Sequence, residues 1–467
     1  MKRIIRNIAL GGFMAAAISL PAQNTNSGYF LEGYTYRYQM NPAFGNGTGN
    51  DSTRTDANFV SMPGLGNLNV GVNGTLNLSS VLYNVDGRTC LFTNPGVSVA
   101  EVMGNIHDKN RIGADVRVNV LSAGFKAWGG YNTVSINARA SVAASVPGSF
   151  FSLVKEGVSN RTYDIKNLSA RAIGYGELAL NHSRDVRQVP GLRVGAAMKF
   201  LVGVAHVDAR FNEAHLTLGT DGWTGTSDAD IYANLGKLQF EHDTNKEGRE
   251  YVSGVNMDGE GSVGPNGFGM AFDLGASYKW KDFEFSLAVL DLGWISYADT
   301  KCASTNGVRH VNTDAYIFNV DNDATNSFEK EWDRLSDDLG ALYQLSDNGN
   351  VGSRTYSPAA TLNVGVGYAL PVYRKLRFGV LSSTRLAGRY SWTEARVSAN
   401  VAPAKCFSAD ANVAFGTFGT SFGWLLSFHH TGFNMFVGMD HTLGKVTKQF
   451  VPLSSNASVN FGINFPF

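Results

Sequence analysis

Residue types that perform catalysis are present in this chain, but their spacing matches no common catalytic motif. The sequence contains no G-x-S-x-G, H-E-x-x-H or C-x-x-C motif, and no Gly-rich phosphate loop between a strand and a helix. His429 and His430 are adjacent, so on a strand their rings face opposite sides and do not bind one metal ion together. We therefore expect no enzyme activity, no metal site and no cofactor.

One acidic loop has part of the spacing of a calcium-binding loop. Asp321, Asp323 and Asn326 supply oxygen donors, but the twelfth position is Trp332, where such a loop needs a bidentate Glu. The segment is therefore interpreted as a polar loop and not as a calcium site.

The cysteines leave two arrangements open. Their number is three, so at least one thiol is unpaired. Cys90 and Cys302 both fall in long predicted loops, and a disulfide between them is one interpretation. Three free thiols, including Cys406, are the other.

The last nine residues, VNFGINFPF, alternate between large apolar and small or polar side chains. Successive strand side chains point to opposite faces, so one face of this strand is apolar and the other carries Asn460 and Asn464. Such a strand closes the wall of an outer-membrane barrel, or it needs a covering sheet in a soluble sandwich. Three aromatic residues of this ending resemble the C-terminal assembly signal of Gram-negative barrels: Phe461, Phe465 and Phe467.

The first residues have the three parts of a secretory signal peptide. Lys2, Arg3 and Arg6 form a basic region, and an apolar core too short to span a bilayer follows. We expect cleavage between Ala22 and Gln23, so that residues 1–22 are removed on export. Both ends of the chain are typical of an outer-membrane protein of a Gram-negative bacterium.

Composition supports a membrane wall made of strands. The chain has 39 basic and 39 acidic residues, so no electrostatic argument favours nucleic acid as a partner. Charged residues make up only 17%, aromatic residues 12%, and glycine is abundant at 53 residues. Transmembrane barrels combine a lipid-facing apolar band with aromatic girdles at both interfaces. Outer-membrane lipid is therefore the expected surrounding.

A two-residue period recurs along most of the chain. Each run alternates apolar residues with Asn, Ser, Thr, Gly or charged ones, which a sandwich exposes to water and a barrel to its lumen. Short turns near 129–130, 281–282 and 373–374 contrast with long polar stretches at 79–111, 242–267 and 299–355. This asymmetry favours an all-β transmembrane antiparallel barrel of about 14 strands. The barrel is assigned to residues 64–467, and the polar segment 23–63 before it is a candidate plug in the lumen.

Two short helices interrupt the strand pattern. One is predicted over 327–343, where apolar residues recur at helical spacing. It either packs on the barrel rim or acts as a gate or partner-binding helix, and its apolar residues include Phe328, Trp332, Leu335 and Leu339. The second is predicted over 149–156, and Gly157 ends it.

The opening after the signal peptide resembles a known group of barrels. The segments GYFLEGYTYRYQMNPAFGNG and FVSMPGLGNLNVGVNGTLNLSSVLY resemble a family of uncharacterised Bacteroidota outer-membrane barrels. Within the first segment, Asn41, Pro42 and Ala43 resemble the N-P-A signature of long-chain fatty acid transporter-like (FadL-like) barrels, a group that includes PorV-type barrels. The segment VLDLGWI at 289–295 also matches. The resemblance implies 14 strands, an N-terminal plug carrying those three residues, and assembly by the barrel-assembly machinery.

Two functions follow from this resemblance and from the strand pattern. The first is a passive channel or transporter for small hydrophobic compounds, which predicts an apolar lumen. The second is a non-transport barrel that anchors or shuttles a surface or secreted partner through its long loops, as PorV-type barrels do. That function predicts a filled lumen and apolar loop tips.

Overall fold

The strands expected from the two-residue period pair edge to edge into one closed antiparallel wall. The computed structural model describes residues 26–45, 58–76, 80–156, 159–219, 222–245, 248–256, 264–312, 340, 342–442 and 456–467. The wall has 14 strands, and β1 and β2 together form the first of them. It closes because β25 pairs with β24 on one side and with β1 and β2 on the other. The predicted fold class and strand number are confirmed.

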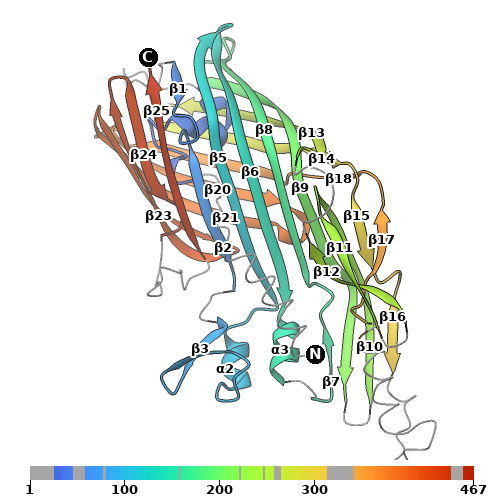
Figure 1. Cartoon of the computed structure of the whole chain (residues 1–467). Coiled ribbons are helices and arrows are strands. Elements are labelled where there is room, and N and C mark those ends of the chain that lie inside the picture. The colour runs from blue at the N-terminus through green and yellow to red at the C-terminus, as the bar shows by residue number, and fades with distance from the viewer. Residues whose placement is uncertain are drawn as a thin grey trace, which may run out of the picture.

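In order around the ring, the wall strands are β1 (Phe59–Ser61) with β2 (Leu68–Gly74), β5 (Lys109–Ala127), β6 (Gly130–Pro147), β8 (Ser169–Asp185), β9 (Leu192–Leu218), β13 (Gly267–Trp280), β14 (Phe283–Tyr297), β19 (Ala360–Ala369), β20 (Leu376–Leu386), β21 (Trp392–Ala404), β22 (Phe407–Gly416), β23 (Gly419–His430), β24 (Phe433–Met439) and β25 (Ala457–Pro466) (Figure 1).

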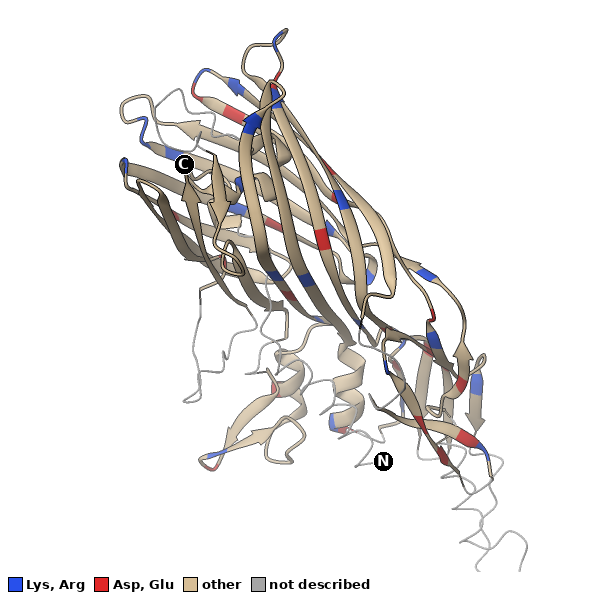
Figure 2. Cartoon of the chain, turned by 45° about the horizontal axis from the view of Figure 1, so that its top comes forward, with Lys and Arg blue, Asp and Glu red and all other residues tan. Residues whose placement is uncertain are grey.

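The two faces of the wall have opposite character. In β25, Val459 and Phe465 are exposed on the outside, whereas Asn460 and Asn464 are buried on the inside. Charged residues are sparse along the wall strands (Figure 2). An apolar exterior around a polar interior is the pattern of a barrel that stands in lipid. The protein is therefore an outer-membrane β-barrel.

The two ends of the barrel differ in their connections. The hairpins β5–β6, β13–β14 and β19–β20 turn tightly at the end where the C-terminus lies (Figure 1). The turn between β13 and β14 uses Lys281 at a φ of 55°. Long connections lie at the opposite end. Short turns face the periplasm in such barrels and long loops face outward, which orients the molecule.

An extension of the wall projects beyond the extracellular rim. Residues 192–203 of β9 pair with β13, but residues 205–218 of the same strand pair with β10. The added strands continue the sheet away from the ring, as the right side of Figure 1 shows. They are β7 (Arg161–Asp164), β10 (Trp223–Leu235), β15 (Lys301–Ser304), β16 (Arg309–Asn312), β17 (Ser346–Asn350) and β18 (Arg354–Tyr356). The hairpin β11 (Gln239–Thr244) to β12 (Glu250–Asn256) packs on this extension.

Among the described residues, helical segments are few and short. The helix predicted at 149–156 is α3 (Gly148–Glu156), which packs at the rim with α2 (Val99–Gly104) and the hairpin β3 (Leu82–Val85) to β4 (Arg88–Leu91). The 3-10 turns are η1 (Asn26–Gly28), η2 (Thr35–Gln39), η3 (Pro42–Phe44) and η7 (Gly388–Tyr390). Within the described ranges, no helix has the length and apolarity to cross a membrane.

Several predicted features lie outside the described residues. These are the signal peptide with its cleavage point at Ala22 and Gln23, the acidic loop at 321–332, and the gate or partner helix residues Phe328, Trp332, Leu335 and Leu339. The cysteines are described, and each has a free thiol. The interpretation of a disulfide between Cys90 and Cys302 is therefore wrong, because the two residues lie on separate sheets, in β4 and β15.

Candidate functional site in the barrel lumen

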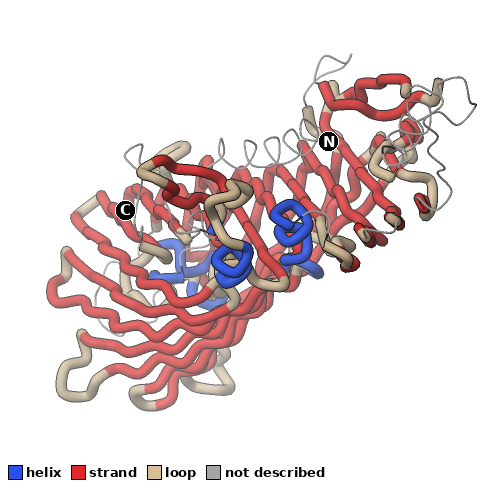
Figure 3. Tube along the Cα trace, turned by 90° about the horizontal axis from the view of Figure 1, so that it is seen from below, coloured by secondary structure: helices blue, strands red, loops and turns tan. Residues whose placement is uncertain are grey.

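Residues 26–45, called the plug segment below, fold inside the ring of strands. Figure 3 shows their helical turns within the curve of the wall. Apolar side chains of the plug segment form one buried cluster with inward-facing wall residues. The plug segment contributes Tyr29, Phe30, Leu31, Tyr34, Tyr36, Tyr38, Met40 and Phe44, and the wall contributes Phe59, Tyr131, Leu381, Leu425 and Phe436. Burying each large side chain stabilises the folded state by about 1.5–3 kcal/mol.

The residues of the N-P-A signature contact the backbone of the wall through their side chains. Asn41 Nδ2 donates to the carbonyl oxygens of Ala276 (3.2 Å) and Leu287 (3.4 Å), and Asn41 Oδ1 accepts from Ala43 N–H (2.9 Å). Pro42 lies against Gly275, where an added Cβ would be 2.8 Å from Pro42 Cδ. The signature residues are thus a tight docking turn of the plug segment on β13 and β14.

This contact predicts the effect of one methyl group. Gly275→Ala places Cβ into Pro42 and the Asn41 side chain, and overpacking of this kind costs about 1–3 kcal/mol. We expect the gel-mobility shift of the folded barrel to be lost at a lower temperature. Gly176→Ala is the matched control, because its Cβ would meet no atom closer than 4.0 Å. Equal stability of the two variants would show that the docking turn is loose.

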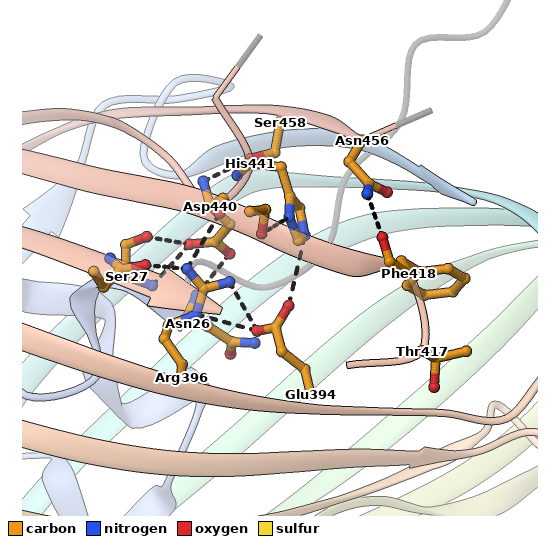
Figure 4. A network of polar contacts seen from close by, with 12 residues as sticks. Asn26, Ser27, Glu394, Arg396, Thr417, Phe418, Asp440, His441, Asn456 and Ser458 are labelled. Carbon is orange, nitrogen blue, oxygen red and sulfur yellow. Dashed lines mark hydrogen bonds and ion pairs between the residues drawn. The ribbon is translucent and has the colours of Figure 1, made fainter. Parts of the chain in front are cut away.

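The amino end of the plug segment is held by one carboxylate of the wall. Asp440 accepts hydrogen bonds from Asn26 N–H (2.8 Å), Ser27 N–H (2.7 Å) and Ser27 Oγ (2.5 Å). Behind it, Arg396 donates to Glu394 Oε1 (2.8 Å) and to the Asp440 carbonyl oxygen (3.2 Å), as Figure 4 shows. All five residues are buried, so the capture of residues 26 and 27 takes place away from bulk water.

Polar contacts also hold the remaining plug segment. Arg193 Nε donates to the Ala43 carbonyl oxygen (2.9 Å), and Asn363 Nδ2 donates to that of Met40 (2.9 Å). Arg377 bridges the plug and the wall because it pairs with Glu32 at 2.5 Å and with Glu284 of β14. The plug segment is therefore attached along its whole length.

A layer of six buried charges crosses the lumen on the extracellular side of the plug segment, and we call it the charge layer. It consists of Arg117, Arg139, Lys199, Glu177, Asp273 and Asp291. Three positive and three negative groups balance, as buried charges must to avoid a large desolvation penalty. The charge layer therefore presents no net charge to a solute.

Asp291 is the centre of the charge layer. Its carboxylate accepts hydrogen bonds from both terminal nitrogens of Arg139 (2.9 Å each) and from Lys199 Nζ (2.6 Å). Its own N–H donates to Asp273 Oδ1 (2.7 Å). Asp291 has a φ of 55°, and the β13–β14 register shifts beside Asp273, so a bulge turns both carboxylates inward.

A small cavity borders the charge layer. A cavity of about 50 Å³ lies between the charge layer and the extracellular mouth. Its lining includes Asn26, Arg139, Tyr175, Asp291 and Trp392. This volume holds a few water molecules and is far below the ~300–1,000 Å³ of a pocket for a drug-sized ligand.

The two adjacent histidines have different surroundings in the structure. His429 Nε2 lies 3.3 Å from Ser408 Oγ inside the wall, and His430 is exposed. Within the described ranges, no group of three or more His, Cys, Asp or Glu has the geometry to hold a metal ion.

Sequence reasoning found the signature residues but missed the charge layer and the Asp440 contact. Glu177 and Arg139 are single charged residues in strands whose polar and apolar residues alternate. No local sequence motif therefore distinguishes them from other inward-facing polar residues. One signal was present, because the VLDLGWI segment breaks its alternation at Asp291.

One family model covers most of the chain. The model of a family of unknown function, DUF5723, matches residues 53–440. The chain belongs to the DUF5723 family. No curated protein matches the sequence at a significant level.

Solved structures similar to this DUF5723 chain are barrels. The toluene transporter TbuX of Ralstonia pickettii is 10% identical with a TM-score of 0.41, covering 92% of each chain. The toluene transporter TodX of Pseudomonas putida is 8% identical with a TM-score of 0.36, over 96% of this chain and 94% of that one. A FadL homologue of Pseudomonas aeruginosa is 10% identical with a TM-score of 0.33, over 96% and 98%. These are the kinds of barrel that the Asn41-Pro42-Ala43 resemblance predicted. At these scores they carry no functional argument, and the barrel assignment rests on the strand pairing.

Proposed function

We propose that this DUF5723 protein is a passive outer-membrane channel for small hydrophobic compounds, kept closed by its plug segment. One observation carries the proposal. Five wall residues face the lumen with apolar side chains at the height of the plug segment, although lumenal positions elsewhere are mostly polar. Displacement of the plug segment would expose this apolar band to a solute. The apolar lumen expected for a transporter is therefore present in part, and the plug segment occupies it.

Displacement of the plug segment is what transport would require. Besides the apolar cluster, polar contacts would have to break along the segment, from Asp440 at its amino end to Arg193 at Ala43. A cavity of about 50 Å³ is too small for passage while these contacts hold. The proposal thus assigns the plug segment, residues 26–45, a gating role and assigns the protein no catalytic role.

Deletion of residues 26–45 tests the proposal. We expect uptake of a small apolar probe such as toluene by proteoliposomes to rise well above that of the full-length protein. Deletion of residues 239–256, which removes the external hairpin β11–β12, is the control and should leave uptake unchanged. Both proteins must first show the gel-mobility shift of a folded barrel.

If the deletion variant does not fold, a variant with a disulfide between the plug segment and the wall tests the same proposal. Ser27→Cys combined with Asp440→Cys is expected to link the plug segment to the wall under oxidation, because these side chains are in contact. Oxidation should then abolish uptake and reduction should restore it. Equal uptake in both states would refute gating by the plug segment.

Two processing steps belong to the proposal. We infer that signal peptidase cuts between Ala22 and Gln23, and that the barrel-assembly machinery recognises the C-terminal strand. In the folded barrel, Phe465 and Phe467 are exposed on the outer face of that strand, and Phe461 is partly exposed. Mass determination of the mature protein tests the first step.

A second candidate is a barrel that holds a surface or secreted partner. Its specific support is the extension, in which β9 continues past the rim and carries β10, β15, β16 and β17 outside the membrane. Removal of this extension should abolish partner capture without affecting uptake. The reverse result would favour the channel.

A further inference from the structure

The short turns at the periplasmic end of the barrel carry an excess of positive charge. They are the connections between successive wall strands at 128–129, 186–191, 281–282, 370–375, 405–406 and 431–432, and we call them the basic rim. Five basic residues and one acidic residue lie in the basic rim, which gives a net charge of +4. Figure 2 shows basic residues in blue on turns at this end of the barrel. All five are exposed: Arg187, Lys281, Arg374, Lys375 and Lys405.

The one acidic residue of the basic rim does not neutralise it. Asp282 pairs with Arg374 at 3.5 Å, but the Arg374 side chain is 78% exposed, so the pair contributes only about 0–1 kcal/mol. The adjoining strand ends add two exposed basic residues, Lys126 and Arg184, and one exposed acidic residue, Asp185. The positive charge is therefore a property of the whole rim.

The opposite end of the barrel has the reverse charge balance. The connection 219–266 between β9 and β13 contains nine acidic and three basic residues, and the connection 298–359 between β14 and β19 contains ten and five. The whole chain has 39 residues of each sign, so the basic rim does not reflect a general excess of cations. Charge is thus polarised along the barrel axis.

Exposed apolar side chains lie in the same turns as the cations. Trp128 is 79% exposed and Val372 is 88% exposed, and Tyr373 and Trp280 are also exposed. Lys281 Nζ lies 5.0 Å from the centroid of the Trp280 ring. Aromatic residues of a transmembrane barrel gather at the level of the lipid headgroups. Cations beside them are therefore placed where lipid phosphates lie.

We propose that the basic rim binds the phosphate groups of anionic phospholipids in the periplasmic leaflet of the outer membrane. Each Lys or Arg near an anionic lipid surface adds to the attraction between protein and lipid. The five cations are spread over four of the six turns, which favours a ligand that surrounds the barrel over a protein docked on one side. The exposed apolar side chains agree with lipid, because they can enter the acyl-chain region below the headgroups.

Quenching of tryptophan fluorescence by dibrominated lipids tests the proposal. The full-length protein is reconstituted into vesicles with dibrominated phosphatidylglycerol or dibrominated phosphatidylcholine as the quencher. Trp128 and Trp280 lie at the basic rim and report on the lipids there. We expect phosphatidylglycerol to bind about threefold more strongly at low salt. The preference should disappear at ~1 M NaCl, where the screening length is ~3 Å.

Two variants with equal loss of positive charge locate the lipid site. The rim variant should bind both lipids equally, and it combines Arg187→Gln, Lys281→Gln, Arg374→Gln, Lys375→Gln and Lys405→Gln. The control variant changes five exposed cations at the opposite end and should keep the preference: Arg88→Gln, Arg161→Gln, Lys166→Gln, Lys237→Gln and Arg389→Gln. If the rim variant lacks the gel-mobility shift, Lys281→Gln with Lys405→Gln replaces it, and its preference should be lower than that of the full-length protein.

Three results would each overturn the proposal. One is a folded rim variant that keeps the full preference, and another is an equal loss in the control variant. The third is equal binding of both lipids by the full-length protein, which would leave an acidic periplasmic protein as the partner of these cations. Solute uptake is not part of these measurements, so failure of the lipid site and failure of the proposed channel are distinguishable.

Discussion

Asp291→Ala is expected to destabilise the folded barrel by about 3–5 kcal/mol, the cost of removing one partner of a buried ion pair. The substitution takes both carboxylate oxygens from Arg139 and one of two acidic partners from Lys199. Those cations are almost fully buried, so water does not replace the lost contacts. The temperature at which the gel-mobility shift disappears should fall strongly.

Two further variants separate loss of charge balance from loss of packing. Asp185→Ala is the control, because the Asp185 side chain is 76% exposed and its pair with Arg193 contributes about 0–1 kcal/mol. Asp291→Ala with Lys199→Met should recover part of the stability, since the second change removes a cation left without balance. A double variant no more stable than Asp291→Ala would mean that the wall bulge, and not charge balance, is what Asp291 maintains.

Asp440→Ala is expected to free the amino end of the plug segment. It removes an acceptor from three donors of Asn26 and Ser27, and hydrogen bonds to a charged group contribute about 1.5–3 kcal/mol each. Arg396 keeps its contacts with Glu394 and with the Asp440 carbonyl oxygen, so the wall should stay intact. We expect brief openings in planar-bilayer recordings of this variant and no openings with the full-length protein.

Glu32→Ala is the comparison for this experiment. Glu32 is partly exposed, and its partner Arg377 keeps Glu284 when Glu32 is removed. Openings should therefore be rarer than with Asp440→Ala. If neither variant shows ionic current, the apolar cluster alone is sufficient to hold the plug segment. Opening of the proposed channel would then require disruption of that cluster.

The plug segment inside the ring limits what each functional model allows. Its presence there agrees with the expectation for a partner-holding barrel, and the inward apolar band agrees in part with that for a transporter. Opening currents from Asp440→Ala would therefore be stronger support for the channel than any static feature. Partner capture that depends on the extension would favour the alternative.

The position of the plug segment was predictable only in outline. The Asn41-Pro42-Ala43 resemblance implied a plug, and its contact with β13 follows from the small size of Gly275. The partner of its amino end was not predictable, because Ser27 and Asp440 are 413 residues apart and neither lies in a motif. The helix around Trp332 lies outside the described residues and stays a prediction.

The sequence by itself determined the character of each strand, because the two-residue period is a local property that separates outward from inward side chains. Val459 and Asn460 could be assigned to opposite faces without any knowledge of neighbouring strands. Turn positions such as Lys281 were equally local. Tertiary structure alone decided which inward residues meet. Arg139 and Asp291 are 152 residues apart, and their contact depends on the register of every strand pair between β6 and β14 and on closure of the ring.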